Sequence, residues 1–399
     1  MSLRIMTSSL NRKKLRLAMW SYAEQVKGQG VASAYREQVN LLRAQLDGFE
    51  LRENPPSVSK RTELCDIYHV HSINTSIFMK MRLLKRFAPE KPLVVSVHFL
   101  PETLKESITL PPLARFVFER YVLCFYRQAD HLVTVNPDFI DRLKALGFDE
   151  KRLHYIPNYV KKEDFYLESP YMQASAVEQV ADFTSANTTS TNPIAADLAA
   201  GLEAERRRKS FYKEKAQEEF GLDLTKFTVL CVGQIQTRKG VLDFLELARA
   251  MPEISFVWAG GFSFGRISHG YKKLKAALEH VPDNVSFLGI VQRENMPLLY
   301  AAADLLWQPS YSELFPMTIL EAFAAELPVL LRDLSLYDHI VKDFACFAHD
   351  NKGFIDKIKE FSSQPLELER YRKRACAGAS FYSAEQVSKK WEQFYRSLI

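Results

Sequence analysis

Short apolar runs recur along the second half of this chain, and stretches of helical periodicity separate them. The expected strands span residues 227–232, 255–261, 285–291, 304–309 and 328–331. Runs rich in β-branched residues are typical of buried strands. Strands that alternate with helices predict a parallel sheet covered by helices on both faces.

The first half shows the same alternation. Its expected strands are residues 3–8, 67–71, 92–98 and 131–135, and its expected helices are residues 32–45, 75–87 and 113–127. Two such units favour an α/β fold with two doubly wound, Rossmann-like domains, and a length of 399 residues suits two domains. Ligands bind such sheets at the carboxyl ends of the strands.

Composition changes between the two units. Residues 174–202 are rich in Ala, Ser, Thr and Asn, so we expect a poorly ordered or partly helical insertion there. A charged helical pattern follows at residues 203–220. The expected division of the chain is a first domain at residues 1–165, a linker at 166–215, a second domain at 216–378 and a last helix at 379–399.

Charge and cysteine content narrow the partners and the compartment. Residues 1–160 hold 24 Lys and Arg against 16 Asp and Glu, whereas the remainder holds 29 against 32. The basic first half favours an anionic partner. No apolar run approaches the roughly 20 residues of a spanning helix, and the N-terminus lacks the shape of a signal peptide. Cys65, Cys124 and Cys231 lie in apolar surroundings, which predicts core thiols in the reducing cytoplasm.

Two glutamates carry the strongest chemical signal. Glu313 and Glu321 stand eight positions apart with Pro316 between them, which predicts a loop that enters a helix near Pro316. The N–H groups of Met317 and Thr318 at the helix start favour an anion. An ordinary amphipathic helix with glutamates is the plainer explanation, but an anion site flanked by carboxylates suits a phosphate beside hydroxyl groups.

A basic loop lies upstream of this segment. The expected strand at residues 227–232 ends at Gly233, and a helix is expected from Gly240. Arg238 and Lys239 lie in the loop between them, where two cations would neutralise a diphosphate. A solvated basic turn is the alternative when this loop is considered alone.

Together these segments resemble the donor half of retaining glycosyltransferases of family 4, which have the GT-B fold. The resemblance implies a UDP-sugar donor bound by Gly233, Arg238 and Lys239 and by the stretch Phe315, Pro316, Met317 and Thr318. It also implies that Glu321 binds the ribose and that Glu313 binds the donor sugar. No metal ion or other cofactor is expected, because cationic side chains and a helix dipole balance the leaving diphosphate.

The resemblance extends to the first half. It places His98, at the end of an expected strand, beside the reacting sugar. It also implies that Gly28 and Gly30 let the backbone approach the diphosphate, although Gln29 separates the two glycines here. In this family the last helix returns to the first domain. His69 and His71 are expected to be structural.

Other segments resemble a narrower group, the bacterial synthases that add a second sugar to α-glucosyl-diacylglycerol. These segments are residues 95–102, 155–159, 233–244, 256–265, 311–317 and 331–334. Within the group the resemblance is to the α-1,2-galactosyltransferases, which implies UDP-galactose and glucosyl-diacylglycerol as substrates and a product suited to anchoring lipoteichoic acid. A UDP-glucose-dependent diglucosyl lipid synthase, or another family 4 enzyme of cell-envelope polysaccharide synthesis, is the near alternative.

Basic segments in the first half favour contact with an anionic membrane. Residues 76–87 and 110–127 combine aromatic, aliphatic and basic residues at helical spacing, and residues 12–16 add a basic cluster. We therefore expect a cytoplasmic protein bound peripherally to the inner face of the plasma membrane. No nucleic-acid-binding motif is visible. A UDP-sugar 2-epimerase or a non-catalytic binding protein of the same fold is the rival hypothesis.

Overall fold

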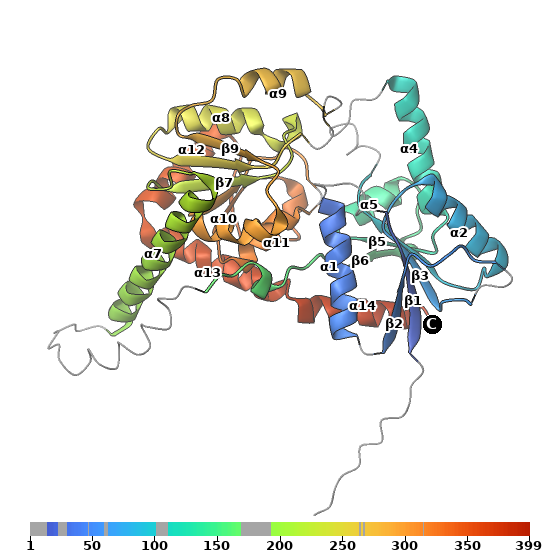
Figure 1. The fold of residues 1–399 in the computed structure, drawn as a ribbon. Coiled ribbons are helices and arrows are strands. Elements are labelled where there is room, and N and C mark those ends of the chain that lie inside the picture. The colour runs from blue at the N-terminus through green and yellow to red at the C-terminus, as the bar shows by residue number, and fades with distance from the viewer. Residues whose placement is uncertain are drawn as a thin grey trace, which may run out of the picture.

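The fold consists of two bodies, each built on a six-stranded parallel sheet with helices on its faces (Figure 1). The structure is a computed structural model. It describes residues 14–22, 30–46, 48–59, 63–100, 111–168, 193–262, 265, 268–313 and 315–399. The predicted fold class, two doubly wound α/β units, is confirmed.

The first sheet has the strand order β2-β1-β3-β4-β5-β6. Its strands are β1 Leu15–Trp20, β2 Phe49–Glu53, β3 Ile67–Val70, β4 Leu93–Val97, β5 His131–Thr134 and β6 Leu153–Tyr155. Its helices are α1 Gly30–Gln45, α2 Thr75–Phe87, α4 Pro112–Arg127 and α5 Asp138–Ala145, and short 3-10 turns lie at Glu150–Arg152 and Lys162–Asp164. β3 and β4 are hydrogen-bonded neighbours, so the residues that follow them meet at one edge of the sheet.

Of the expectations for the first half, one is untested and two need correction. The segment expected as a strand at residues 3–8 lies outside the described residues, and the first described strand is β1. Part of the basic cluster at residues 12–16 therefore belongs to a sheet: Arg16 pairs with Glu63 and lies 3.7 Å from Asp66. Cys124, expected in the core, is exposed on α4.

The second sheet has the order β12-β11-β10-β7-β8-β9. Its strands are β7 Thr228–Val232, β8 Ser255–Ala259, β9 Val285–Gly289, β10 Leu305–Gln308, β11 Val329–Arg332 and β12 Cys346–Ala348. The helices of this body are α7 Pro193–Phe220, α8 Val241–Ala250, α9 Tyr271–Ala277, α10 Met296–Ala302, α11 Met317–Ala324, α12 Asn351–Ser363 and α13 Pro365–Phe381. Its 3-10 turns are Thr237–Lys239, Arg293–Asn295 and Ser335–Tyr337.

The helix α7 begins earlier than the charged pattern at residues 203–220 indicates. It starts at Pro193, inside the stretch expected as an insertion, and packs along α10. The Lys209 ammonium contributes to this contact, because it donates to the carbonyl oxygens of Ala301 (3.0 Å) and Ala303 at the C-terminal end of α10. α7 is therefore attached to the second body.

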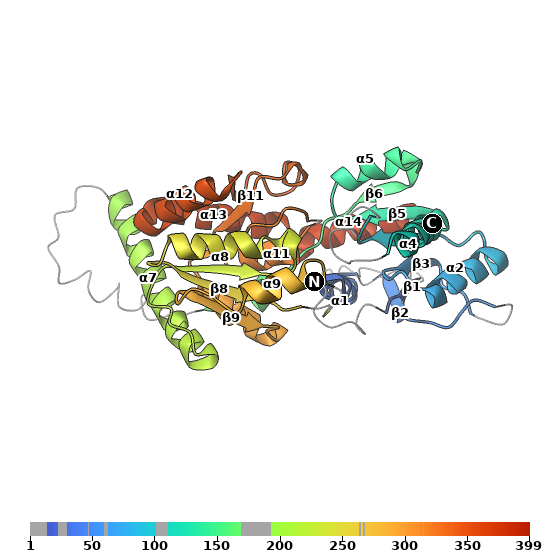
Figure 2. The same ribbon diagram turned by 90° about the horizontal axis from the view of Figure 1, so that it is seen from above.

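The last helix, α14 Ala384–Ser397, packs against the first sheet although it follows the second body in sequence (Figures 1 and 2). Its apolar face carries Val387, Trp391, Phe394 and Tyr395, which share one buried cluster with β1 and α1. The helix begins with a Ser383 side chain that accepts from the Gln386 N–H. This packing fixes Trp391 beside the strand ends of the first body.

Candidate active site

The loop after β7 and the loop after β10 meet, because these strands are neighbours in the second sheet. Gly240 has a φ of 76°, and a Cβ atom there would lie 2.6 Å from the carbonyl oxygen of Pro309. Only glycine allows this approach. The Tyr311 N–H donates to the Arg238 carbonyl oxygen at 2.7 Å, and the Arg238 guanidinium donates to the Ser312 carbonyl oxygen at 2.9 Å.

This contact brings three predicted site residues together. The Lys239 ammonium forms an ion pair with the Glu313 carboxylate, and Nη1 of Arg238 lies 3.6 Å from Oε2 of Glu313. Gln308 also donates to Glu313, at 3.2 Å. The Glu313 side chain is only 6% exposed. Burial raises the pKa of Glu313, but the charges of Lys239 and Arg238 outweigh it and lower the pKa to about 2.

Gly233, at the end of β7, packs against the side chain of Lys239. Its N–H donates to the Ala259 carbonyl oxygen and its own carbonyl oxygen accepts from the Trp258 indole, both at 2.9 Å. The side-chain carbons of Lys239 lie 3.7 Å from where a Cβ atom of Gly233 would stand. These two hydrogen bonds fix the end of β7 next to the Lys239 side chain.

The helix start predicted near Pro316 is present. Pro316 lies one residue before the helix and does not occupy its first position. Pro316 is the extended residue that precedes α11, and α11 begins at Met317. Thr318 has a buried hydroxyl without a hydrogen-bond partner among the described residues. Phe315 is buried and packs against Tyr382 with the ring centres 5.3 Å apart, so its side chain belongs to the core.

Glu321 lies in the second turn of α11. It accepts a hydrogen bond from the Tyr300 hydroxyl at 2.6 Å and another from Arg293 at 3.4 Å. Burial raises its pKa, although these two donors counteract the effect. Arg293 also pairs with Glu37 of α1, so one guanidinium connects the two bodies. Sequence analysis missed Arg293 and Glu37, because no local pattern relates residues so far apart.

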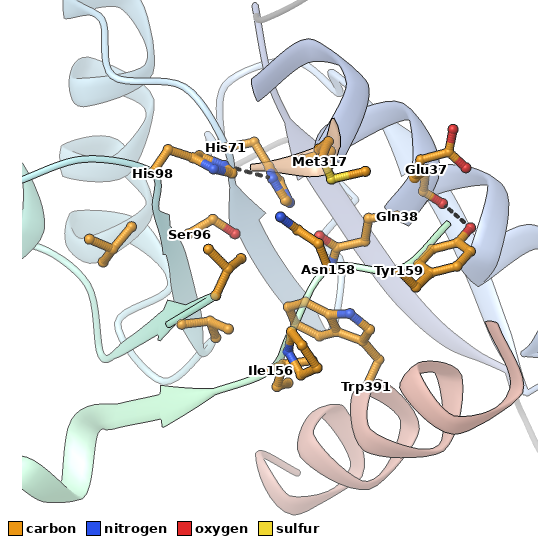
Figure 3. Close-up of a pocket in the computed structure, with 15 residues that line it drawn as sticks. Glu37, Gln38, His71, Ser96, His98, Ile156, Asn158, Tyr159, Met317 and Trp391 are labelled. Atoms are coloured by element: carbon orange, nitrogen blue, oxygen red, sulfur yellow. Dashed lines mark hydrogen bonds between the residues drawn. The ribbon is translucent and has the colours of Figure 1, made fainter. Parts of the chain in front are cut away.

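A pocket lies between the bodies, close to the start of α11 (Figure 3). Its polar lining comes mainly from the first body and includes His98, His71, Ser96, Gln38 and Asn158. Met317 lines the pocket from the second body, and Trp391 lines it from α14. His98 follows β4, and its Nε2 lies 3.3 Å from Nδ1 of His71. Burial lowers the pKa of His98 to about 4, so its ring is neutral at pH 7.

The structure thus gathers the predicted residues in two groups. Arg238, Lys239 and Glu313 form one cluster, and His98 lines a pocket with Met317. Gly28 lies outside the described residues, and Gly30 is the first residue of α1. Among the described side chains, no group of three His, Cys, Asp or Glu could hold a metal ion.

Known proteins resemble both halves of the chain. Residues 54–164 match the family described as Glycosyltransferase Family 4, and residues 212–377 match Glycosyl transferases group 1. The alpha-galactosylglucosyldiacylglycerol synthase of Streptococcus pneumoniae is 37% identical over 387 residues, 97% of this chain and 90% of that protein. The processive diacylglycerol alpha-glucosyltransferase of Acholeplasma laidlawii is 24% identical over 84% of each chain.

The fold also matches solved structures. Anabaena HepE, crystallised with UDP and glucose, superimposes with a TM-score of 0.67 over 96% of this chain and all of that one, at 14% identity. The resemblance that began with Arg238, Lys239, Glu313 and Glu321 therefore extends to both halves of the chain and to the fold as a whole. The chain is a glycosyltransferase of the GT-B fold and belongs to glycosyltransferase family 4.

Proposed function

We propose that this enzyme transfers a hexose, galactose from UDP-galactose, to α-glucosyl-diacylglycerol with retention of anomeric configuration. The observation that carries the proposal is the buried Glu313 carboxylate beside Arg238 and Lys239 at the start of α11. The relative from Streptococcus pneumoniae, a synthase of galactosylglucosyldiacylglycerol by name, supports the choice of lipid and sugar.

In the proposed reaction the diphosphate binds at Arg238 and Lys239 and at the α11 N-terminus. The bond between the anomeric carbon and the phosphate oxygen breaks, and its electron pair leaves with the diphosphate. The acceptor hydroxyl oxygen bonds to the anomeric carbon on the same face, and its proton passes to the departing phosphate oxygen. The two cations stabilise the charge that develops on the diphosphate. No metal ion is required for this step.

The carboxylates and the first body bind the sugars. Glu321 accepts from the ribose hydroxyls, Glu313 accepts from the donor sugar, and His98 faces the reacting centre. We propose that the backbone at Gly30, the first residue of α1, approaches the diphosphate together with Gly28, which lies outside the described residues. Residues 1–165 bind the acceptor, residues 216–378 bind the nucleotide sugar, and residues 379–399 return to the first body. Of the expected linker at residues 166–215, residues 193–215 belong to α7, which packs against the second body.

A surface on the first body supports membrane contact. Leu113, Phe116 and Val117 in the first turns of α4 are 76%, 57% and 59% exposed, and Arg120 lies one turn further along the same helix face. Met79 and Phe87 of the neighbouring α2 are also exposed. No helix among the described residues is long and apolar enough to cross a bilayer. We propose that this surface attaches the enzyme to the inner face of the plasma membrane, where the glucolipid lies.

The test is to incubate the enzyme with glucosyl-diacylglycerol and, separately, UDP-galactose, UDP-glucose or UDP-N-acetylglucosamine, and to analyse the lipid by mass and linkage. A lipid that gains one hexose only with UDP-galactose supports the proposal. Gain with UDP-glucose alone would instead indicate a diglucosyl lipid synthase. Loss of UDP-sugar without any acceptor would favour an epimerase, and vesicle binding without release of UDP would favour a binding protein.

A further inference from the structure

His71 lies directly after β3, next to His98, and carries a polar atom that the predicted mechanism does not use. Its N–H donates to the Trp20 carbonyl oxygen at 2.9 Å, which holds the residue at the sheet edge. The side chain is 3% exposed, and Nδ1 contacts His98. Among the described residues, Nε2 has no hydrogen-bond partner. A buried polar atom left unpaired is costly, so such an atom in a pocket indicates a ligand.

The neighbouring His69 shows what a structural histidine looks like in this fold. Its Nδ1 lies 2.7 Å from the Tyr395 hydroxyl and its Nε2 lies 2.9 Å from Ser96 Oγ. Gln38 also donates to the Tyr395 oxygen, at 3.1 Å. Both ring nitrogens of His69 therefore have a hydrogen-bond partner within the protein. His71 differs from His69 because its Nε2 has no hydrogen-bond partner among the described residues.

The surroundings of His71 suit a sugar hydroxyl. Its ring extends from the His98 contact toward the interior of the pocket, where Gln38 and Asn158 also lie above Trp391 (Figure 3). Polar groups that face an aromatic ring are the usual way to bind a sugar, whose hydroxyls need partners while its C–H face packs on the ring. Burial keeps the pKa of His71 well below its ordinary value, so the ring is neutral.

A neutral imidazole carries one N–H, and this couples His71 to His98. When a hydroxyl donates to Nε2 of His71, the His71 proton resides on Nδ1. That N–H then donates to Nε2 of His98, which leaves the proton of His98 on its Nδ1. The group bound at His71 thus decides which nitrogen of His98 is a donor.

We propose that His71 is a positioning residue: its Nε2 binds a hydroxyl of a substrate sugar, and its Nδ1 fixes the tautomer of His98. This inference rests on the proposed function for the identity of the sugar. The hydroxyl belongs either to the donor hexose or to the glucose of the acceptor.

Two variants separate the two nitrogens. The amide nitrogen of His71→Asn takes the place of Nδ1 and keeps the partner of His98, whereas that of His71→Gln takes the place of Nε2 and does not. His71→Phe removes both. The tautomer of His98 is measured by NMR of ¹⁵N-histidine-labelled full-length enzyme, with His98→Gln for assignment, before and after addition of UDP-galactose or of methyl α-glucoside. Thermal unfolding identifies variants that do not fold.

We expect the wild type to show one His98 tautomer once the additive is bound, and His71→Asn to show that tautomer with or without it. His71→Gln and His71→Phe should show a mixture of the two tautomers under both conditions. For transfer to the glucolipid, kcat should fall by about tenfold or more in His71→Gln while KM for the UDP-sugar stays unchanged, and His71→Asn should recover much of the loss. The additive that sharpens the His71 signals identifies the source of the hydroxyl. An unchanged His98 tautomer and wild-type kcat in folded His71→Phe would overturn the inference. Because the NMR measurement needs no turnover, an inactive wild type would refute only the proposed function.

Discussion

Arg293 and Glu37 stand 256 positions apart and form an ion pair that joins the two bodies of the enzyme. Arg293 lies in the turn before α10, and Glu37 lies on α1 with only 5% of its side chain exposed. The same guanidinium reaches Glu321, the residue proposed to bind the ribose. The bridge therefore couples the position of α1 in the first body to α11 in the second.

Replacing Arg293 with alanine should destabilise the enzyme and loosen the two bodies. The change leaves the buried Glu37 and Glu321 carboxylates without their shared cation. Because Arg293 is 30% exposed, we expect a loss of about 1–3 kcal/mol, less than the 3–5 kcal/mol typical of a fully buried pair. Thermal unfolding measures the stability, and small-angle X-ray scattering should show a larger radius of gyration.

Lys389→Ala is the matched control. Lys389 pairs with Glu385 on α14, and both side chains are more than 60% exposed, so the loss should stay below about 0.5 kcal/mol. Equal stability losses in the two variants, or an unchanged radius in Arg293→Ala, would contradict a role for Arg293 in holding the bodies together.

The pH dependence of stability should reveal Glu313. Its pKa is about 2 in the folded enzyme, against an ordinary value of 4.5. The folded state therefore binds this proton less readily than the unfolded state, and the stabilisation is fully present above pH 4.5 and lost as pH falls toward 2. Glu313→Gln, which mimics the protonated side chain, should cost on the order of 2–3 kcal/mol at pH 7.

Urea unfolding of the wild type and Glu313→Gln at pH 7, 5 and 3.5 measures this effect. The difference in unfolding free energy between the two proteins should be constant between pH 7 and 5 and should become smaller at pH 3.5. A Glu313→Gln variant that is more stable than the wild type at pH 7 would show that the Glu313 carboxylate is destabilising in the folded enzyme.

Membrane binding should depend on the exposed face of α4. Phe116→Glu with Val117→Glu puts two negative charges where we propose contact with anionic lipid, so binding to vesicles that contain phosphatidylglycerol should fall at least about tenfold. Leu366→Glu is the control, since Leu366 is 59% exposed on α13 of the second body. Co-sedimentation measures binding. An equal loss in the control would mean that overall charge, and not α4, determines attachment.

The sequence indicated most of the fold because buried parallel strands are short apolar runs. β4, with all five residues buried, is such a run. β2 was missed because it is an edge strand whose exposed and half-buried positions carry charged residues, Glu50, Arg52 and Glu53. β1 was missed because Arg16 made its start resemble a basic surface segment.

The predicted site residues that meet in the structure lie in two local motifs. Arg238 and Lys239 follow one strand and Glu313 follows its neighbour, so the topology of the sheet joins them. The contact of His71 with His98 follows in the same way from the pairing of β3 with β4. The bridge from Arg293 to Glu37 depends instead on packing between the two bodies. No spacing along the chain encodes such a contact, and only the structure showed it.

Removing either cation beside Glu313 should affect catalysis more than folding. If Arg238 and Lys239 stabilise the departing diphosphate, Arg238→Ala and Lys239→Ala should each lower kcat for hexose transfer by about 100-fold or more. Lys239→Arg keeps the charge but replaces a compact ammonium, paired with the buried Glu313, by a larger planar guanidinium, and should remain well below the wild type. Addition of EDTA should leave the wild-type rate unchanged. Lys226→Ala, at an exposed lysine that donates to the Pro252 carbonyl oxygen, controls for loss of a basic charge from the same body and should retain full activity. If a folded Arg238→Ala or Lys239→Ala variant had the wild-type kcat, the replaced cation would not stabilise the departing diphosphate and the proposed mechanism would be wrong on that point.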